Sequence, residues 1–269
     1  MPSRIRCCYL SVVLALVSAQ SAHAWGQKGH DVIAYIAEQH LTDVTRQKVD
    51  SILDGMSMVY WANWLDNASH TPDYRYTSSW HYKNIDVEYT YEEAPVIPEG
   101  NIITAVTAVI DSLSSPELTR PTALFNMKLI VHLIGDMHQP MHFGRLSDIG
   151  GNTTAVIYFR NDKNLHGIWD TELVEQAHRW SYTEWQQQLD RLSQQQEQEI
   201  LKGSIDDWGK EVHDICREIY ETTPFDQSLE YDYVAHWTPV IETLLVKGGL
   251  RLAHVLNTIF DPTYTALPE

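Results

Sequence analysis

The segment from residue 131 to residue 142 concentrates metal-binding side chains at the end of one predicted helix. His132 and Asp136 are four residues apart, so a helix places them on one face. Pro140 cannot continue the helix, and we expect the chain to turn there and to carry His142 back over the same end. The segment therefore predicts that three metal ligands converge without any long-range folding.

The same spacing recurs at His166 and Asp170, again an imidazole and a carboxylate one helical turn apart. Two such pairs predict a multinuclear metal site. Three further candidate ligands lie near tryptophans, namely His30, Asp66 and His81. Mixed imidazole and carboxylate ligands favour zinc, although manganese and iron accept similar sets.

The first 24 residues have the pattern of a secretory signal peptide. Two arginines precede the apolar run from Tyr9 to Val17, and Ala22-His23-Ala24 forms a small-residue cleavage signal. Cleavage after Ala24 makes Trp25 the first residue of a mature protein that is periplasmic or secreted. The apolar run is too short for a spanning helix, and an uncleaved membrane anchor is the alternative.

Charge and cysteine content limit the function classes. The formal charge of -17 becomes -19 when Arg4 and Arg6 leave with the signal peptide, which argues against broad electrostatic binding to duplex nucleic acid. A local excess of positive charge at a metal site still permits a phosphate substrate. Cys216 is the one cysteine that remains after cleavage, so we expect no intramolecular disulfide.

Apolar residues recur at helical spacing through most of the chain. We expect helices over about residues 33–41, 102–113, 122–137, 168–177, 182–200, 206–220 and 231–259, the last with a bend at Pro239 or at Gly248-Gly249. Only residues 153–159 have the composition of a strand. Residues 25–269 are therefore expected to form a single all-α domain with at most a short β-hairpin, and the loops over 61–91 and 143–152 are expected to carry the site.

Several motifs occur together in one order: Trp25-Gly26-x-x-Gly29-His30, Trp61-Ala62 through Asp66, Trp80-His81-Tyr82, His132 through His142, Gly150-Gly151-Asn152, and Asn164-Leu165-His166-x-x-Trp169-Asp170. In this combination the chain resembles the zinc-dependent single-strand nucleases and 3'-nucleotidases of the mung bean nuclease type. That family is related in fold to the zinc phospholipases C.

The resemblance implies three zinc ions. One of them is bound by four side chains, those of Asp66, His81, His132 and Asp136. A close neighbour is bound by the free amine and carbonyl oxygen of Trp25, by His30 and by the bridging Asp136. The third and more exposed ion is bound by His142, His166 and Asp170.

The resemblance also implies hydrolysis of single-stranded DNA and RNA to 5'-phosphate products, together with 3'-nucleotidase activity. A water shared by the close metal pair attacks phosphorus, and the third zinc stabilises the leaving 3'-oxygen. Asp66 and Asp136 are the catalytic candidates, Asp66 to orient the water and Asp136 as the shared ligand. No stable membrane association and no protein partner are inferred.

A base-stacking pocket is implied by the same resemblance. Tyr82 and Ile149 sandwich a base there, and Asn84 and Asn152 line the pocket. Because a stacked base must be unpaired, this pocket favours single strands without reading their sequence. Plain packing is the alternative role of Tyr82 and Ile149.

The chain departs from the family pattern at two positions. Fungal members carry Asp where Asn84 stands, which leaves base preference open. They commonly carry Arg where this chain has Ser69, and Arg75 and Arg145 are the candidates to replace that cation. The remaining histidines are expected to be structural or solvent-facing, and these are His40, His70, His138, His178, His213, His236 and His254.

Two competing functions remain at this point. A zinc phospholipase C is the alternative enzyme, but the short spacing from Trp25 to His30 and the presence of Asp170 rather than Glu favour the nuclease. A zinc-buffering protein without catalysis is the other class. Such proteins use flexible His-rich tracts or closed sites, whereas these ligands are spread over several helices.

Overall fold

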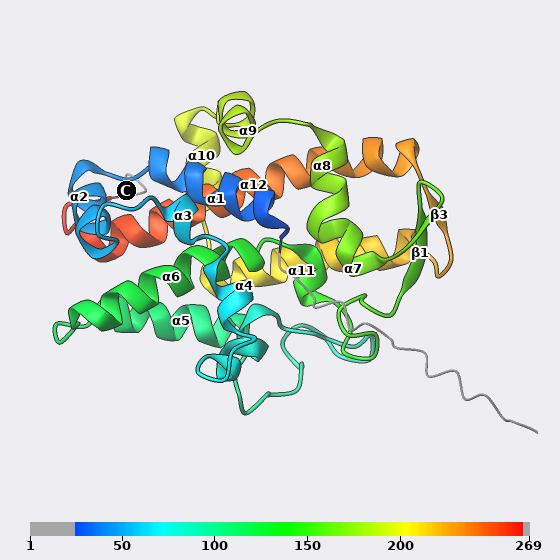
Figure 1. Cartoon of the computed structure of the whole chain (residues 1–269), viewed down its shortest axis with the longest axis horizontal. Helices are drawn as coiled ribbons and strands as arrows, with labels where there is room; N and C mark the ends of the chain where they lie inside the picture. Colours follow the sequence, from blue (N-terminus) through cyan, green and yellow to red (C-terminus); the bar gives the residue numbers. More distant parts are fainter. Residues whose placement is uncertain (1–24, 266–269) are drawn as a thin grey trace, which may run out of the picture.

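A computed structural model describes residues 25–265 of the chain. The expected signal peptide lies outside the described residues. The helices are α1 (Gln27–Gln39), α2 (Asp43–Ile52), α3 (Met58–Trp61), α4 (Trp64–Ala68), α5 (Ile102–Leu113), α6 (Arg120–Asp136), α7 (Leu165–Gly167), α8 (Leu173–Ala177), α9 (Tyr182–Leu189), α10 (Gln194–Leu201), α11 (Ile205–Thr222) and α12 (Tyr231–Phe260). Two 3-10 segments, η1 (Arg75–His81) and η2 (Pro140–Phe143), and one π-helical segment, η3 (Ile168–Glu172), complete the helical part (Figure 1).

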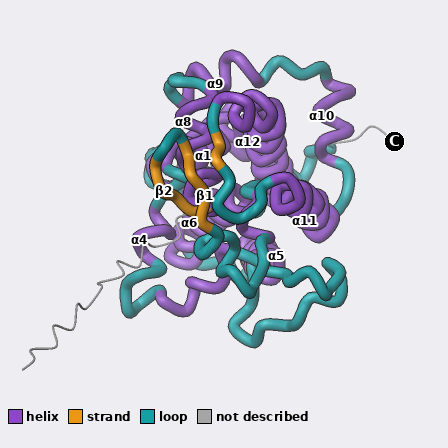
Figure 2. The backbone as a smooth tube through the Cα atoms, turned by 90° about the vertical axis from the view of Figure 1, so that its right-hand side faces the viewer, coloured by secondary structure: helices purple, strands orange, loops and turns teal. Residues whose placement is uncertain are grey.

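A small sheet lies at one side of the helices (Figure 2). Its strands are β1 (Ala155–Tyr158), β2 (Asn161–Asn164) and β3 (Ser228–Leu229), in the order β2-β1-β3. The first two form the short antiparallel hairpin that the all-α prediction allowed, and β3 adds a parallel strand from a distant part of the chain. The fold class is thus confirmed, with one short strand beyond the expected hairpin.

Most predicted helices are present, but the single helix expected over residues 182–200 is wrong. The expected helix over 182–200 is divided into α9 and α10, because Asp190 leaves the helical conformation and Ser193 begins a new helix with a capping box to Gln196. The region 168–177 also changes character, from the π segment η3 to α8. Helix α2 was not predicted; Thr42 caps its first turn.

The long helix α12 packs along α1, as Figure 1 shows. The pair Gly248-Gly249 lies inside a continuous helix and makes this close approach possible. A Cβ at Gly249 would lie 2.4 Å from Cγ2 of Ile36, and one at Gly248 would lie 3.0 Å from Cδ1 of Ile33. Helix α12 is continuous through the glycines, and the two residues serve its close packing against α1.

The packing of α1 and α5 against α6 carries several candidate ligands into the interior. Helix α6 is buried along its second half, and Gly135 has no side chain where His30 approaches; a Cβ there would lie 2.5 Å from the His30 Nδ1 atom. The segments α4 and η1 also pack against α6. Among the described residues, no helix combines the length and apolarity needed to span a membrane.

We predict that Gly249→Ala destabilises the protein by about 1–3 kcal/mol, because the added methyl group overlaps the Ile36 side chain in a packed interface. Thr258→Ala, at an exposed position of the same helix, is the control and should change the free energy of unfolding by less than about 0.5 kcal/mol. Chemical denaturation of both variants measures the difference. Equal stability of the two variants would contradict the close helix contact.

Candidate metal centre

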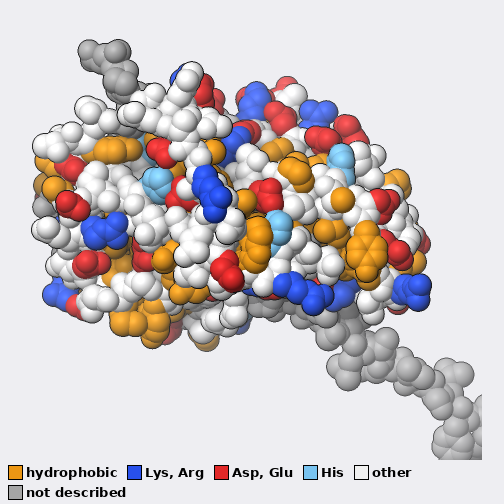
Figure 3. Space-filling model, turned by 90° about the horizontal axis from the view of Figure 1, so that it is seen from above, with side chains coloured by type: hydrophobic (Ala, Val, Ile, Leu, Met, Phe, Trp, Pro, Cys, Tyr) orange, Lys and Arg blue, Asp and Glu red, His pale blue; other side chains and the backbone are white. Residues whose placement is uncertain are grey.

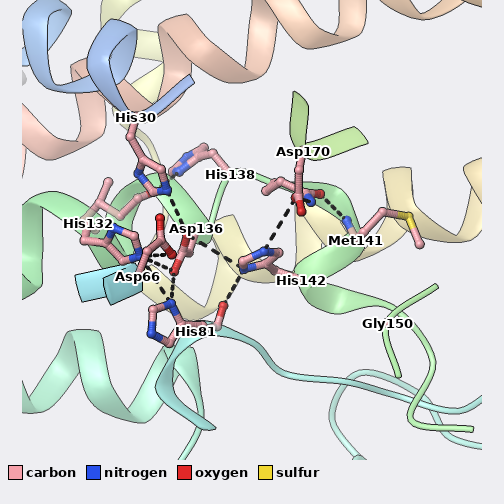
Figure 4. A network of polar contacts seen from close by, with 12 residues as sticks. His30, Asp66, His81, His132, Asp136, His138, Met141, His142, Gly150 and Asp170 are labelled. Atoms are coloured by element: carbon pink, nitrogen blue, oxygen red, sulfur yellow. Dashed lines mark hydrogen bonds and ion pairs between the residues drawn. The ribbon is translucent and has the colours of Figure 1, made fainter. Parts of the chain in front are cut away.

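Asp136, the last residue of α6, is the centre of a buried cluster of imidazoles (Figure 4). Its Oδ1 lies 3.2 Å from Nε2 of His30. Its Oδ2 lies 2.8 Å from Nδ1 of His81 and 3.1 Å from Nε2 of His132. Helices α1 and α6 and the segment η1 thus each place one imidazole against the same carboxylate.

Asp66 of α4 extends this cluster, because its Oδ1 lies 3.4 Å from Nε2 of His132. Two overlapping groups of side chains result, each with ligand atoms close enough together to hold a metal ion. The groups are His30, Asp66 and His132, and His81, His132 and Asp136. Since both contain His132 and their members are in contact, two ions bound here would be close neighbours.

A second cluster contains His142, His166 and Asp170, which also form a group able to hold a metal ion. Nε2 of His166 lies 3.2 Å from Oδ2 of Asp170, and Nε2 of His142 lies 4.0 Å from Oδ1 of the same carboxylate. Asp170 belongs to the π segment η3, an irregularity that is common at functional sites. Nδ1 of His142 is 3.9 Å from Oδ1 of Asp136, so the two clusters adjoin.

Backbone carbonyl groups fix the orientation of three imidazoles. Nδ1 of His132 donates to the Ala62 carbonyl at 2.7 Å, and Nδ1 of His142 donates to the His81 carbonyl at 2.6 Å. Nδ1 of His166 donates to the Gly150 carbonyl at 2.6 Å. Because a carbonyl only accepts, each ring carries its proton on Nδ1 and directs Nε2 toward the neighbouring carboxylate.

The electrostatics of the cluster carboxylates and of His142 favour the protonation states that metal binding requires. Burial acts to raise the pKa of Asp136, but the His132 and His142 imidazoles hold it well below its usual range. Burial also acts to raise the pKa of Asp66, but the neighbouring His132 outweighs this effect and the pKa is lowered to about 2. Burial lowers the pKa of His142 to about 3 and raises that of Asp170 to about 6. At neutral pH the carboxylates are ionised and His142 is a neutral donor.

The donor atoms left over by this network fit metal ions. Nε2 of His30 and Oδ1 of Asp136 are buried in the described structure without hydrogen-bond geometry to any partner, and Nε2 of His81 is in the same situation. Buried polar atoms without partners are costly in a folded protein. A cation bound between Nε2 of His30 and Oδ1 of Asp136, which lie 3.2 Å apart, would satisfy these two atoms, so the residues present fit the metal that the donor set suggests.

Trp25 lies two residues before the start of α1 and is fully buried. The backbone amide of Gly26 donates to the Asp170 carbonyl at 2.6 Å, which ties the start of the described chain to η3. Gly29 leaves room for the indole, since a Cβ there would lie 2.8 Å from Cβ of Trp25. The first residues of the described chain therefore lie beside Asp170 of the second cluster.

The expected base-pocket residues come from two adjacent segments. The extended segment over residues 82–85 pairs with the segment after η2, because the amides of Lys83 and Ile85 donate to the carbonyls of His142 and Gly144. Because side chains alternate between the two faces of an extended segment, those of Tyr82 and Asn84 lie on the same face. A Cβ on Gly150 would lie 3.3 Å from Oδ1 of Asn84, so Asn84 reaches the loop that carries the other two residues of the pocket.

In that loop, Ile149 is 60% exposed and has a left-handed backbone with φ 56°. A β-branched residue in this conformation is strained. The amide of the Asn152 side chain donates to the Ile149 carbonyl at 2.8 Å. Its exposure argues against plain packing as the role of Ile149, whereas Tyr82 is half-buried.

Sequence reasoning missed Gln139, which is fully buried between the two clusters. Its Nε2 donates to Oδ1 of Asp170, and its Oε1 accepts from the Met141 amide. It therefore positions a carboxylate of the second cluster. Its position between the candidate ligands Asp136 and His142 in one short motif was the signal that the sequence offered.

His138, inside the same motif, faces away from the clusters toward α12. Its Nδ1 donates to the Ile134 carbonyl, and its Nε2 accepts from Arg251 at 3.1 Å. Burial and the Arg251 charge lower the pKa of His138 to about 3. Two other histidines outside the clusters form surface pairs with carboxylates, His40 with Asp190 and His178 with Glu242.

The residues weighed as sources of a cation have different surroundings. Ser69 is buried, and its hydroxyl donates to the Asp66 carbonyl. Arg75 is exposed in η1, and the Arg145 guanidinium stacks on the Tyr220 ring at 4.1 Å. On the face shown in Figure 3, Lys and Arg side chains are interspersed with Asp and Glu.

Comparisons with known proteins agree with this geometry. The family model for S1/P1 nuclease matches residues 25–261. Endonuclease 5 and endonuclease 4 of Arabidopsis thaliana are 26% and 27% identical to the chain, over 94% and 97% of it and over 96% and 97% of their own lengths. Nuclease S1 of Aspergillus oryzae is 28% identical over 91% of the chain and 94% of its own length. Because the family match extends over nearly all described residues and includes both clusters, this chain belongs to the S1/P1 nuclease family.

Proposed function

We propose that this protein is an exported zinc-dependent nuclease that hydrolyses single-stranded DNA and RNA to products with 5'-phosphates and also acts on 3'-nucleotides. The observation that carries the proposal is the pair of adjoining His and Asp clusters around Asp136 and Asp170. Relatives named as nucleases and endonucleases favour this activity over a phospholipase. The signal peptide pattern supports export to the periplasm or medium.

Three zinc ions are the proposed content. The first would be held by Asp66, His81, His132 and Asp136. The second would be held by Trp25, His30 and Asp136, and the third by His142, His166 and Asp170. Bound zinc supplies an acidified water and positive charge that offsets the charge developing on the phosphate.

The chain's own residues orient the reaction. Asp66 accepts a hydrogen bond from an attacking water and directs it toward phosphorus, which its position at 12% side-chain exposure permits. Asp136 is fully buried, so its negative charge interacts strongly with the charged groups around it, because water screens it little. Gln139 keeps the Asp170 carboxylate fixed through its amide.

Selection of single strands is proposed to rest on Tyr82 and Ile149, with Asn84 and Asn152 at the edge of the base. The exposed, strained Ile149 and the buried, unpartnered Oδ1 of Asn84 support this role. A base inserted between these residues must leave its duplex partner.

We predict that the mature protein converts single-stranded DNA and RNA to fragments that carry 5'-phosphates, because a 3'-oxygen is the proposed leaving group. End-group analysis of the digests by mass spectrometry measures this. Fragments that end in 3'-phosphates would refute the mechanism, and turnover of phosphatidylcholine instead of nucleic acid would favour the phospholipase alternative.

Removal of the charge at Asp136 should release the close pair of ions together. We expect Asp136→Asn to bind about two fewer zinc ions per chain and to lose activity by at least about a hundredfold, since two sites lose their shared anion. Metal analysis of the purified variant beside His70→Ala, an exposed histidine, provides the comparison. Retention of both ions by Asp136→Asn would show that this carboxylate is not shared.

The N-terminal amine should matter as well, because the Trp25 nitrogen becomes a neutral donor only after the bond behind Ala24 is cut. A preparation with an extra Met before Trp25 should fold, bind about one zinc fewer and turn over at least about tenfold more slowly than the processed protein. Zinc content, melting temperature and turnover of the two preparations are compared. Equal zinc content and turnover would make Trp25 an ordinary packed aromatic.

A further inference from the structure

A cavity of about 370 Å³ opens beside the metal-binding clusters. It is lined by residues from the start of α1, from α4 and from the segment that leads into α8, and these are Gly26, Gln27, Lys28, Asn63, Asp66, Asn67, Asp170, Thr171, Val174 and Glu175. None of the four expected base-pocket residues contributes to it. A larger cavity of about 490 Å³ lies beyond Phe143 and contains no member of the clusters.

The cavity has a floor and a rim of different character. Asp66 and Asp170, at the floor, have side chains that are 12% and 4% exposed and belong to the two clusters. Lys28 and Glu175, at the rim, have side chains that are 23% and 48% exposed. The scissile phosphate belongs at the floor, next to the clusters, so the rim is available to another part of the substrate.

Lys28 is the only Lys or Arg among the described residues that line this cavity. Its Nζ lies 2.6 Å from Oε2 of Glu175, which joins α1 to α8 across the rim. An exposed ion pair of this kind contributes little to stability, so little is lost when the ammonium takes another anionic partner. The uncharged neighbours Asn67 and Thr171 are exposed and offer further hydrogen-bond donors.

We propose that this rim is a second subsite, in which Lys28 binds the phosphate next to the scissile one and exchanges Glu175 for it. The inference rests on the proposed nuclease function and deepens it. The chain carries a large negative net charge, and therefore a backbone phosphate needs a local cation. A strand of two or more phosphates uses the subsite, whereas a 3'-mononucleotide has a single phosphate, at the floor, and does not reach it.

The test compares two substrates in the metal-loaded full chain. Lys28→Gln should raise KM for a single-stranded oligonucleotide by about tenfold, with kcat unchanged, and should leave KM for a 3'-mononucleotide unchanged. Lys28→Arg should restore the oligonucleotide KM. Glu175→Gln should lower it, because the competing carboxylate is removed. Lys202→Gln removes an exposed lysine that is paired with Glu199, and it should behave as the unmodified protein.

Binding gives an independent readout. Titration with a phosphorothioate oligonucleotide at several salt concentrations should show that Lys28→Gln reduces the slope of log K against log salt by about 0.7, the value for one phosphate contact on a single strand. Equal effects of Lys28→Gln on both substrates, or an unchanged salt slope, would overturn the subsite. If the unmodified protein cleaves neither substrate, the nuclease proposal fails, and the titration still decides whether Lys28 binds the strand.

Discussion

The buried carboxylate of Asp136 is the constraint on which the rest of the structure depends. An ionised carboxylate without partners costs several kcal/mol in a protein interior. Here the imidazoles of His30, His81 and His132 surround it, and they come from α1, η1 and α6. Because these three imidazoles meet at the same carboxylate, formation of the site and docking of these three elements are one event. A helix that failed to dock would leave the carboxylate uncompensated.

The loops gain their order from the same network. Residues 61–91 contain the short helical segments α4 and η1, and residues 143–152 form a loop, yet carbonyl groups from both accept hydrogen bonds from ring nitrogens of the clusters. Ala62 and His81 belong to the first loop and Gly150 to the second. A backbone group that is committed to an imidazole fixes the loop as well as the ring. The irregular segments are therefore as well determined as the helices they connect.

Features that depend on short spacings along the chain could be predicted from the sequence, whereas contacts between distant segments could not. The interval from His132 to Asp136 on one helix was enough to place two groups on one face of α6. The break between α9 and α10 was missed because the glutamines around it favour a helix. Ser193 and Gln196 have the spacing of a capping box, which indicates that a new helix begins there. Strand β3 pairs with β1 although the partner residues Ile157 and Ser228 are 71 positions apart (228 minus 157), and no local pattern indicates that contact.

The site follows the same division. The candidate ligands lie in short motifs, so their spacing and order could be recognised in the sequence. The contact of Lys28 with Glu175 joins residues 147 positions apart, and no local pattern predicts it. Arg75 and Arg145 were chosen as cations because they are near the motifs in sequence, but one is exposed in η1 and the other is stacked on Tyr220. An acidic protein that acts on an anionic polymer needs positive charge only where the phosphates lie. Bound metal at the floor and one lysine at the rim would supply it there, and the remaining surface can stay acidic and disfavour duplex binding elsewhere.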